Sequence, residues 1–332
     1  MEKIRISVKK SVYETLIKDA ASFNITKNNG EINRNEFINR LILFYYEEYT
    51  SSNKERLEAI SRSILSYTDL DKYDLIDLSN DILKRINNLS TIKENEEESV
   101  IVSLKPTKES ETIISYIIDN LINNTSISSF FSMMFESYCS KVKSQRERII
   151  FKDNYDKLMK AIRKERAVFV RMKNNIAPNF TGAIYTLEAS EEMYNYCLFY
   201  IDERIVTIRL SNIEDVKVLT DAISIPEEII DYMDIQIDHG IQYTFNKNDL
   251  EDVVVELTEY GKKLYEKLYI FRPLYYKVEG NKYYFKGSHI QILSYFKRFG
   301  KDGIIIYPEE LRNKMIGYYK TAFYSYINGK ND

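Results

Sequence analysis

The chain has 332 residues, of which 44% are hydrophobic and 29% charged, so it is long enough for two or three domains with sizeable cores. No stretch approaches the roughly 18 apolar residues of a membrane span, and the start, MEKIRISVKK, lacks the apolar segment of a secretory signal. The only cysteines, Cys139 and Cys197, fit no zinc or redox spacing, which predicts a reducing, cytoplasmic compartment rather than a disulfide-stapled fold.

The net charge of −3 hides an uneven distribution along the chain. Residues 141–180 carry a net charge of +8 and residues 262–320 carry another +8, whereas residues 181–261 between them carry −14. Two basic blocks that flank an acidic one could hold a polyanion whatever the total charge. The alternative is that basic and acidic segments neutralise each other inside one domain.

The first fifty residues predict a strand followed by two helices. In KIRISVK, apolar and polar residues alternate, which is the pattern of a half-buried strand. Apolar residues then recur at helical spacing over about 11–23. After the loop TKNNGE, Asn33 or Asn35 could cap the next helix.

The same order of elements returns near residue 99. SVIVSLK alternates as KIRISVK does, at an offset of 96 residues, and two helices follow over about 111–123 and 126–142. Two units of one shape indicate a duplicated element. Between them, residues 53–92 have a helical pattern, and KENEEES is a solvated linker.

A short amphipathic strand followed by two helices resembles the ribbon-helix-helix fold of the Arc and methionine repressors. In that family two strands pair antiparallel over a core of two helix pairs, and the outward strand residues enter the DNA major groove. The resemblance implies that Arg5 and Ser7 read bases, with Ile101 and Ser103 at the corresponding positions of the second unit. The two units could pair with each other or with copies in a second subunit, and they could also serve only as a dimerisation core.

From Glu165 onward the pattern becomes rich in strands. AVFVRM, TGAIYTLEAS, YNYCLFYID, RIVTIRL and VKVL are short successive strands, which predicts a small antiparallel barrel or a strongly bent sheet. The segments from VVVELTEYGKKLYEKLY to EELRNKMIGYYKTAF predict the order β-α-β-β-α-β and a final helix. We therefore expect an α+β protein.

The stretch YNYCLFYIDERIVTIRLSNIEDVKVL is similar to the core of the WYL family, bacterial regulatory modules named for a Trp-Tyr-Leu strand. Tyr196 stands at the motif tyrosine, whereas Asn195 and Cys197 replace the Trp and the Leu, and Arg209 lies in the matching segment TIRLSNI. The resemblance covers roughly residues 150–320. It implies an Sm-like β-barrel followed by the ferredoxin-like extension found after many WYL domains.

Five parts are therefore expected along the chain. They are a ribbon-helix-helix-like unit (1–50), a helical linker (51–98), a second ribbon-helix-helix-like unit (99–145), a WYL domain (146–222) and a ferredoxin-like extension (223–332).

The WYL resemblance implies binding of nucleic acids or nucleotides through polar and basic residues around the barrel. The chemistry is suitable, because guanidinium groups grip phosphates and tyrosine rings stack on unpaired bases. An ion pair with the acidic segment is the alternative role for Arg209, and ordinary packing is the alternative for Tyr196. The predicted nucleic-acid-binding residues, besides Arg5 and Ser7, are Tyr196, Arg204, Arg209, Arg171, Lys173 and Arg312.

Signals of catalysis are weak in this sequence. His239 and His289 are the only histidines, and neither has a second His or Cys at metal-ligand spacing. The sequence contains no phosphate-cradling glycine loop, nucleophile elbow or kinase signature. We expect a protein that is not an enzyme and has no cofactor or metal, with a carboxylate-bound magnesium nuclease as the remaining catalytic alternative.

Ribbon-helix-helix-like units ahead of a WYL module most resemble the WYL accessory proteins of type VI-D CRISPR–Cas loci. This resemblance implies binding of single-stranded RNA and enhancement of an RNA-guided, RNA-cleaving effector nuclease. One alternative is a WYL transcriptional regulator that holds operator DNA through its front end, and another is an oligomerisation scaffold. The duplication and the helical linker also predict a homodimer, and no membrane partner is expected.

Overall fold

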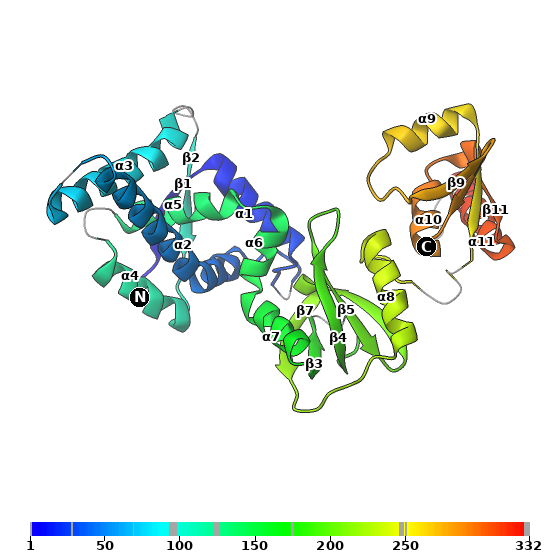
Figure 1. Cartoon of the computed structure of the whole chain (residues 1–332), viewed down its shortest axis with the longest axis horizontal. Helices are drawn as coiled ribbons and strands as arrows, with labels where there is room; N and C mark the ends of the chain where they lie inside the picture. Colours follow the sequence, from blue (N-terminus) through cyan, green and yellow to red (C-terminus); the bar gives the residue numbers. More distant parts are fainter. Residues whose placement is uncertain are drawn as a thin grey trace. The chain divides into compact units, whose positions relative to one another are not determined.

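A computed structural model describes residues 2–27, 29–68, 70–92, 98–122, 126–173, 176–245, 249 and 251–328. The chain divides into two compact units, Met1–Lys152 and Asp153–Asp332 (Figure 1). The described residues form eleven α-helices and three antiparallel sheets, which confirms the predicted α+β class. None of the described helices combines the length and the apolar character needed to cross a membrane.

The first unit is built around a two-stranded ribbon. Strand β1 (Ile4–Lys9) pairs antiparallel with β2 (Ser99–Leu104), and the register puts Ile6 directly opposite Val102. These two residues are 96 positions apart, which is the offset at which the two strand sequences superimpose. A pseudo-twofold axis therefore passes between them. The two strands β1 and β2 pair within one chain, so formation of the ribbon does not require a second subunit.

Two helices follow each strand of the ribbon. Asn33 caps the second helix of the first pair, since its side chain accepts a hydrogen bond from the Glu36 backbone N–H at 3.2 Å. That helix runs unbroken through position 50, where the first expected ribbon-helix-helix-like part (1–50) was predicted to end. The helices of this unit are α1 (Lys10–Ser22), α2 (Arg34–Leu65), α3 (Lys72–Ile92), α4 (Lys108–Asn120), α5 (Ile127–Cys139) and α6 (Lys143–Ile150).

A buried asparagine joins the two halves of the first unit. The Asn39 amide of α2 donates to the Lys105 carbonyl at 3.1 Å. Its oxygen accepts from the Thr107 backbone N–H at 3.1 Å and from the Ser110 hydroxyl at 2.6 Å. Asn39 thus provides hydrogen-bond partners for backbone groups between β2 and α4. A buried polar group without a partner there would destabilise the fold.

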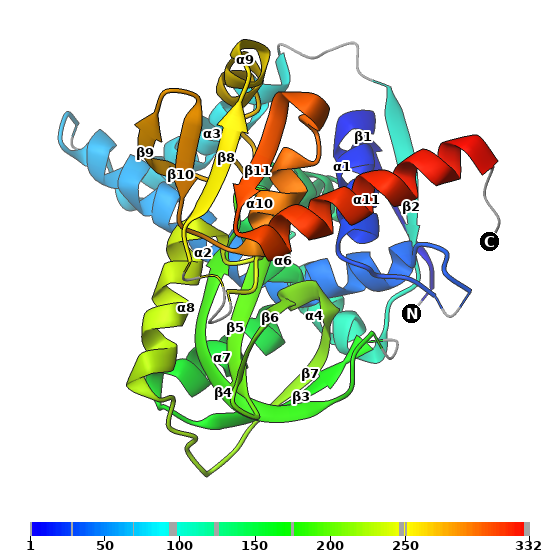
Figure 2. The same ribbon diagram turned by 90° about the vertical axis from the view of Figure 1, so that its right-hand side faces the viewer.

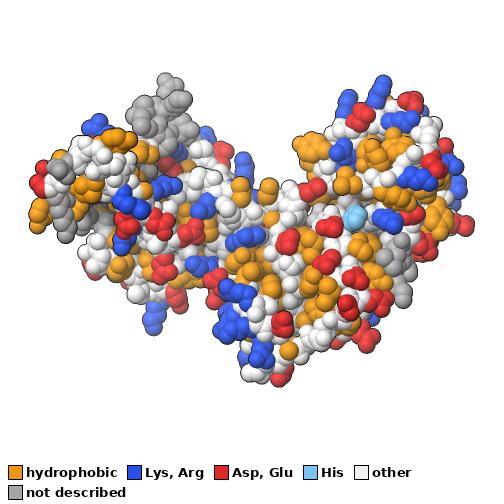
Figure 3. Space-filling view, in the orientation of Figure 1, with side chains coloured by type: hydrophobic (Ala, Val, Ile, Leu, Met, Phe, Trp, Pro, Cys, Tyr) orange, Lys and Arg blue, Asp and Glu red, His pale blue; other side chains and the backbone are white. Residues whose placement is uncertain are grey.

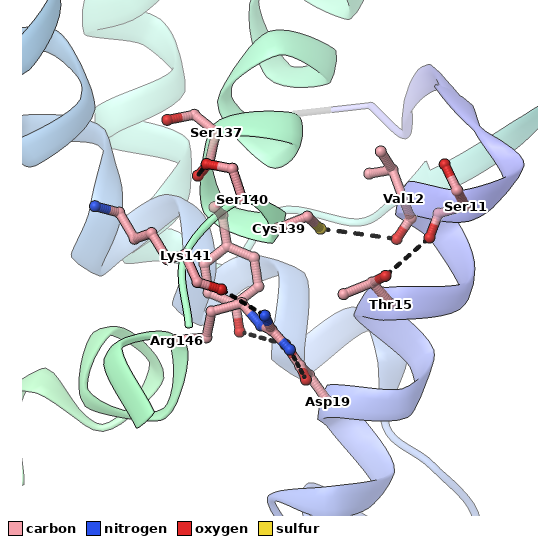
Figure 4. A network of polar contacts seen from close by, with 10 residues as sticks. Ser11, Val12, Thr15, Asp19, Ser137, Cys139, Ser140, Lys141 and Arg146 are labelled. Atoms are coloured by element: carbon pink, nitrogen blue, oxygen red, sulfur yellow. Dashed lines mark hydrogen bonds and ion pairs between the residues drawn. The ribbon is translucent and has the colours of Figure 1, made fainter. Parts of the chain in front are cut away.

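A second polar network ties α6 to this core (Figure 4). Asp19 of α1 is only 2% exposed, and Arg146 of α6 donates to both of its carboxylate oxygens at 2.7 and 3.1 Å. The Tyr138 hydroxyl donates to Asp19 at 3.0 Å, and Arg146 also donates to the Lys141 carbonyl at 2.6 Å. The two-pronged geometry is the strong form of an ion pair. It links α1, α5 and α6.

The second unit begins with helix α7 (Lys152–Arg163) and a five-stranded antiparallel sheet. The strands lie in the order β6-β5-β4-β3-β7, and Figure 2 shows that the sheet is strongly curved. Strands β6 and β7 are its two edges, so closure into the predicted barrel is not confirmed, whereas a bent sheet is found. The strands are β3 (Ala167–Met172), β4 (Phe180–Ala189), β5 (Asn195–Ile201), β6 (Arg204–Arg209) and β7 (Ile213–Val218).

Helix α8 (Glu227–Gly240) covers one face of this curved sheet. Leu198 of β5 forms a buried cluster with Met233 and Ile241, and neighbouring tyrosines pack around it. The buried Gln236 amide of α8 donates to the Thr207 hydroxyl of β6 at 2.7 Å. The position of α8 over β5 and β6 is therefore fixed by both apolar and polar contacts.

The C-terminal part contains a four-stranded antiparallel sheet in the order β11-β8-β10-β9. Its elements follow one another as β-α-β-β-α-β with a final helix, as the sequence predicts. An aromatic core holds it, with the rings of Phe296 and Phe299 4.9 Å apart and those of Phe285 and Phe296 5.3 Å apart. The elements are β8 (Val253–Leu257), α9 (Glu259–Lys267), β9 (Tyr275–Glu279), β10 (Lys282–Phe285), α10 (His289–Phe296), β11 (Gly303–Tyr307) and α11 (Glu309–Asn328).

Candidate nucleic-acid interface

The outer face of the ribbon carries the two residues predicted to read bases. Arg5 lies opposite Ser103 and Ser7 lies opposite Ile101, and all four side chains are exposed. At the edge of β1, the Ser7 backbone N–H donates to the Ser128 hydroxyl at the start of α5, at 2.9 Å. The face offers one guanidinium, two hydroxyls and, at Ile101, an apolar side chain that is 67% exposed.

Tyr196 and Arg209 are neighbours on the curved sheet. They lie directly opposite each other on β5 and β6, so their side chains share the face that α8 covers. Tyr196 is partly buried and packs against the Leu198 cluster. This is the ordinary packing that was given as its alternative to nucleic-acid binding. The guanidinium carbon of Arg209 lies 3.4 Å from the centre of the Tyr194 ring, a cation–π stack.

The other predicted cations lie apart from this pair. Arg204 is exposed at the opposite end of β6 from Arg209, roughly 17 Å away at the rise of a strand. Arg171 of β3 forms an ion pair with Glu214 at 3.2 Å, and Arg312 is exposed on α11. Lys173 follows the end of β3. The predicted site residues therefore do not form a single cluster.

Acidic side chains neutralise part of the first basic block, residues 141–180. This agrees with the alternative in which basic and acidic segments neutralise each other. Four of its cations form ion pairs, and each of these pairs reduces the positive field available to a ligand. The pairs are Lys141–Glu48 at 2.8 Å, Arg146–Asp19 at 2.7 Å, Lys157–Asp215 at 3.1 Å and Arg171–Glu214 at 3.2 Å.

Four other cations of this block lie in the last turn of α7 and in the segment that follows it. Lys160, Arg163, Lys164 and Arg166 are exposed, and none of them forms an ion pair within the described part of the chain. Figure 3 shows Lys and Arg side chains gathered over α7. The Arg166 guanidinium donates to the Thr220 carbonyl, which holds it beside the end of β7. Cations at a helix C-terminus also complement its dipole.

Strand β3, which follows α7 along the chain, carries an exposed aromatic ring. Phe169 is 39% exposed while Val168 and Val170 on either side are buried, because successive residues of a strand face opposite sides. Lys217 of β7 lies directly opposite Phe169 and is exposed, and Thr181 of β4 lies on the other side. We call Arg163, Lys164, Arg166, Phe169 and Lys217 the basic strip.

The two histidines are engaged locally. The His239 ring nitrogen Nδ1 lies 2.8 Å from the Ile235 carbonyl, one turn earlier in α8. The His289 ring lies 3.2 Å from Asp249, which also accepts the His289 backbone N–H. Among the described residues, no group of three or more His, Cys, Asp or Glu side chains is placed to hold a metal.

A known fold extends over almost the whole chain. A solved structure described as the crystal structure of a CRISPR Cas-related protein superimposes with a TM-score of 0.61 and 18% identity. The match covers 98% of this chain and 94% of that one. The two proteins share a fold. Because the identity is this low, the match carries no further information about activity.

A second solved structure matches more weakly. It is the proteasome accessory factor B/C (PafBC) of Arthrobacter aurescens, with 13% identity and a TM-score of 0.25. The match covers 67% of this chain and 36% of that one, and the superposition is too poor to support an argument. No protein-family model matches the chain, and no curated protein matches it.

Sequence reasoning identified only part of this surface. The alternation in AVFVRM already places Phe169 on the same side as Arg171, so the ring could have been found from the sequence. Lys217 could not have been found in this way, because it joins the basic strip only through the pairing of β3 with β7, which are not consecutive strands. The exposed end of α7 was signalled by the charge of residues 141–180.

Proposed function

We propose that this protein is a nucleic-acid-binding accessory regulator that binds single-stranded RNA and enhances an RNA-guided, RNA-targeting CRISPR effector nuclease. Two observations support the proposal. The fold is shared over 98% of the chain with a protein described as CRISPR Cas-related. The sequence also resembles the WYL accessory proteins of type VI-D loci. We further assign the ribbon and its helices to two ribbon-helix-helix-like units, residues 146–222 to a WYL domain and residues 223–332 to its ferredoxin-like extension.

The observation that carries the RNA-binding part is the exposed Phe169 ring beside Lys217, which forms no ion pair with any described residue. Proteins that bind single strands combine stacking on aromatic side chains with a positive surface that follows the phosphates. Phe169 offers the ring, and Lys217 lies directly across the strand pair from it. Arg163, Lys164 and Arg166 are exposed at the end of α7 and in the segment that leads into β3. In a duplex the base faces are stacked on one another. A duplex could therefore bind to the cations through its phosphates but could not stack a base on the Phe169 ring.

A binding comparison tests this proposal. Affinities for an unstructured single-stranded RNA and for duplex DNA are measured at the same stated salt concentration, because phosphate contacts alone make any affinity salt-dependent. We expect a preference for the RNA, reduced by Lys217→Glu. The matched control is Lys301→Glu, an exposed lysine outside the basic strip, which should bind as the parent chain does. An equal loss in both variants would show that only total charge matters.

The accessory role has its own test. Cleavage of a reporter RNA by the guide-loaded effector is followed with and without this protein, and we expect faster cleavage when it is present. Lys217→Glu should reduce the stimulation in proportion to its loss of RNA binding. RNA binding without stimulation would restrict the proposal to binding. Light scattering of the full chain tests the proposed homodimer.

Operator DNA is the second candidate ligand, and the ribbon is the observation that favours it. Arg5 and Ser7 project outward from a complete ribbon formed by one chain. In this alternative a palindromic duplex is preferred over RNA, and Arg5→Ala abolishes the preference. Ile101→Arg would place a second guanidinium at the position related to Arg5 by the pseudo-twofold axis, and should then raise duplex affinity. Binding to neither polymer would favour an oligomerisation scaffold.

A further inference from the structure

A polar cavity of about 410 Å³ lies within the second unit, away from the basic strip. Four segments line it: the turn between β4 and β5, the end of α8, the loop before β9, and α10. Its volume lies in the range of pockets that hold small ligands. Its lining side chains include Ser190, Gln242, Phe271, Arg272 and Gln291.

Three residues that line this cavity each have a buried side-chain oxygen with no hydrogen-bond partner among the described residues. These oxygens are the Ser190 hydroxyl oxygen and the side-chain carbonyl oxygens of Gln242 and Gln291. Ser190 is 6% exposed and Gln291 is 3% exposed. Native proteins rarely leave such groups unpaired, because each one destabilises the fold.

The neighbouring Gln236 shows that this fold can satisfy a buried amide. Its nitrogen donates to the Thr207 hydroxyl and to the Ile241 carbonyl, each at 2.7 Å. Its oxygen accepts from the Phe245 backbone N–H at 3.0 Å. Among the described residues, buried atoms without a partner also occur outside the cavity, at Ser211 Oγ and His289 Nε2, but three of the five belong to residues that line it.

An aromatic side chain in a strained backbone conformation forms part of the wall. Phe271 has a φ of 58°, a left-handed conformation that is unfavourable for a bulky residue. The Glu191 carboxylate holds it there by accepting its backbone N–H at 2.8 Å, and Tyr243 meets its ring edge-on at 5.8 Å. Strain of this kind concentrates at ligand-binding sites.

The charges around the cavity disfavour a phosphate. Arg272 is the one Lys or Arg among the described lining residues, and three carboxylates, those of Glu188, Glu191 and Asp238, oppose it. The groups that lack partners are a hydroxyl and two amides, which are uncharged. An amide presents a donor and an acceptor side by side, and therefore complements an edge of the same kind.

We propose that this cavity binds a planar, uncharged small molecule whose edge carries both hydrogen-bond donors and acceptors, of the chemical class of a free nucleobase or nucleoside. The amides of Gln242 and Gln291 and the Ser190 hydroxyl bind the polar edge, and the Phe271 ring contacts the planar face. This site is independent of the proposed RNA-binding role, because none of its residues belongs to the basic strip.

Calorimetric titration of the full chain with adenosine, guanosine, cytidine and uridine, each separately, tests the proposal. We expect saturable binding of at least one of them, weakened about tenfold or more by Ser190→Ala and by Gln291→Met. Without ligand, both variants should melt at the same temperature as the parent chain or higher, because each loses an unpaired buried oxygen. Gln236→Met is the matched control and should melt at a lower temperature, because it loses three hydrogen bonds.

Three results would overturn this inference: no saturable binding of any of the four nucleosides, unchanged binding in Ser190→Ala, or tighter binding of inorganic phosphate or spermidine than of every nucleoside. Ser190→Ala removes only one oxygen atom, so it provides a test even if Gln291→Met does not fold. Lys217→Glu separates the two proposals. It should weaken RNA binding and leave nucleoside binding unchanged, and a loss of both would place the nucleoside on the basic strip.

Discussion

Replacing Phe169 with alanine should weaken RNA binding without changing its salt dependence. The ring is 39% exposed, so part of its surface is available for a ligand to stack on. A base stacked on an aromatic side chain contributes about 1–3 kcal/mol, which corresponds to roughly a 5- to 150-fold loss of affinity. Stacking releases no counterions, so the slope of log affinity against log salt should stay the same. Removing the Lys217 charge should instead reduce that slope by about 0.7.

Fluorescence anisotropy with a labelled oligouridylate at several salt concentrations measures both quantities. The control is Tyr67→Ala, which removes an aromatic ring that is 87% exposed and lies outside the basic strip. This variant should bind RNA as the parent chain does. Stacking of an RNA base on Phe169 is refuted if Phe169→Ala leaves the affinity unchanged at every salt concentration. It is also refuted if Phe169→Ala changes the salt slope as much as Lys217→Glu does.

Three further predictions concern stability and the extent of the interface. Asp19→Ala should lower the free energy of unfolding in urea by about 3 kcal/mol, because it leaves the partly buried Arg146 guanidinium without its carboxylate partner, and a second change, Arg146→Met, should recover part of the loss. Burial, reinforced by the Asp19 carboxylate, raises the pKa of the Cys139 thiol to about 12. The folded chain thus keeps a proton that the unfolded chain releases, so the free energy of unfolding should fall as the pH rises from about 9 toward 12, and alkylation of Cys139 at pH 8 should be slow. Arg209→Glu should weaken RNA binding about tenfold without unfolding the chain if the interface extends to β6, and unchanged affinity would restrict the interface to the basic strip.

The ribbon was predictable because its information is local. Alternation identified each strand, and the offset of 96 residues between the two sequences agrees with the register in which Ile6 meets Val102. Which copy each strand would pair with was not predictable from alternation, because the pattern is the same for pairing within or between chains. The order of elements in the C-terminal part was predictable for the same local reason.

The strand order of the curved sheet and the grouping of its cations depend on non-local pairing. Strand β3 pairs with β7, and this brings Lys217 beside Phe169, although 48 positions separate them in the sequence. Arg171 was predicted to bind nucleic acid from its residue type, but its side chain meets Glu214, which no local pattern reveals. Charge along the sequence identified the basic block, whereas the ion pairs formed by four of its twelve cations could be seen only in the folded chain.

The asymmetry of the ribbon bears on which ligand the protein binds. The pseudo-twofold axis relates Ser7 to Ser103, so both halves of the ribbon carry a hydroxyl at this position. It relates Arg5 to Ile101, so one half carries a cation where the other carries an apolar side chain. A palindromic duplex presents the same base edges and phosphates to both halves of a ribbon, so it would meet a guanidinium on one side and an exposed isoleucine on the other. Joining the two units in one chain allows this divergence, since the strands no longer need to be identical in order to pair. A ribbon that has lost one of its two matching cations is poorly suited to a symmetric operator. The difference supports a ligand without twofold symmetry, such as a single strand of RNA.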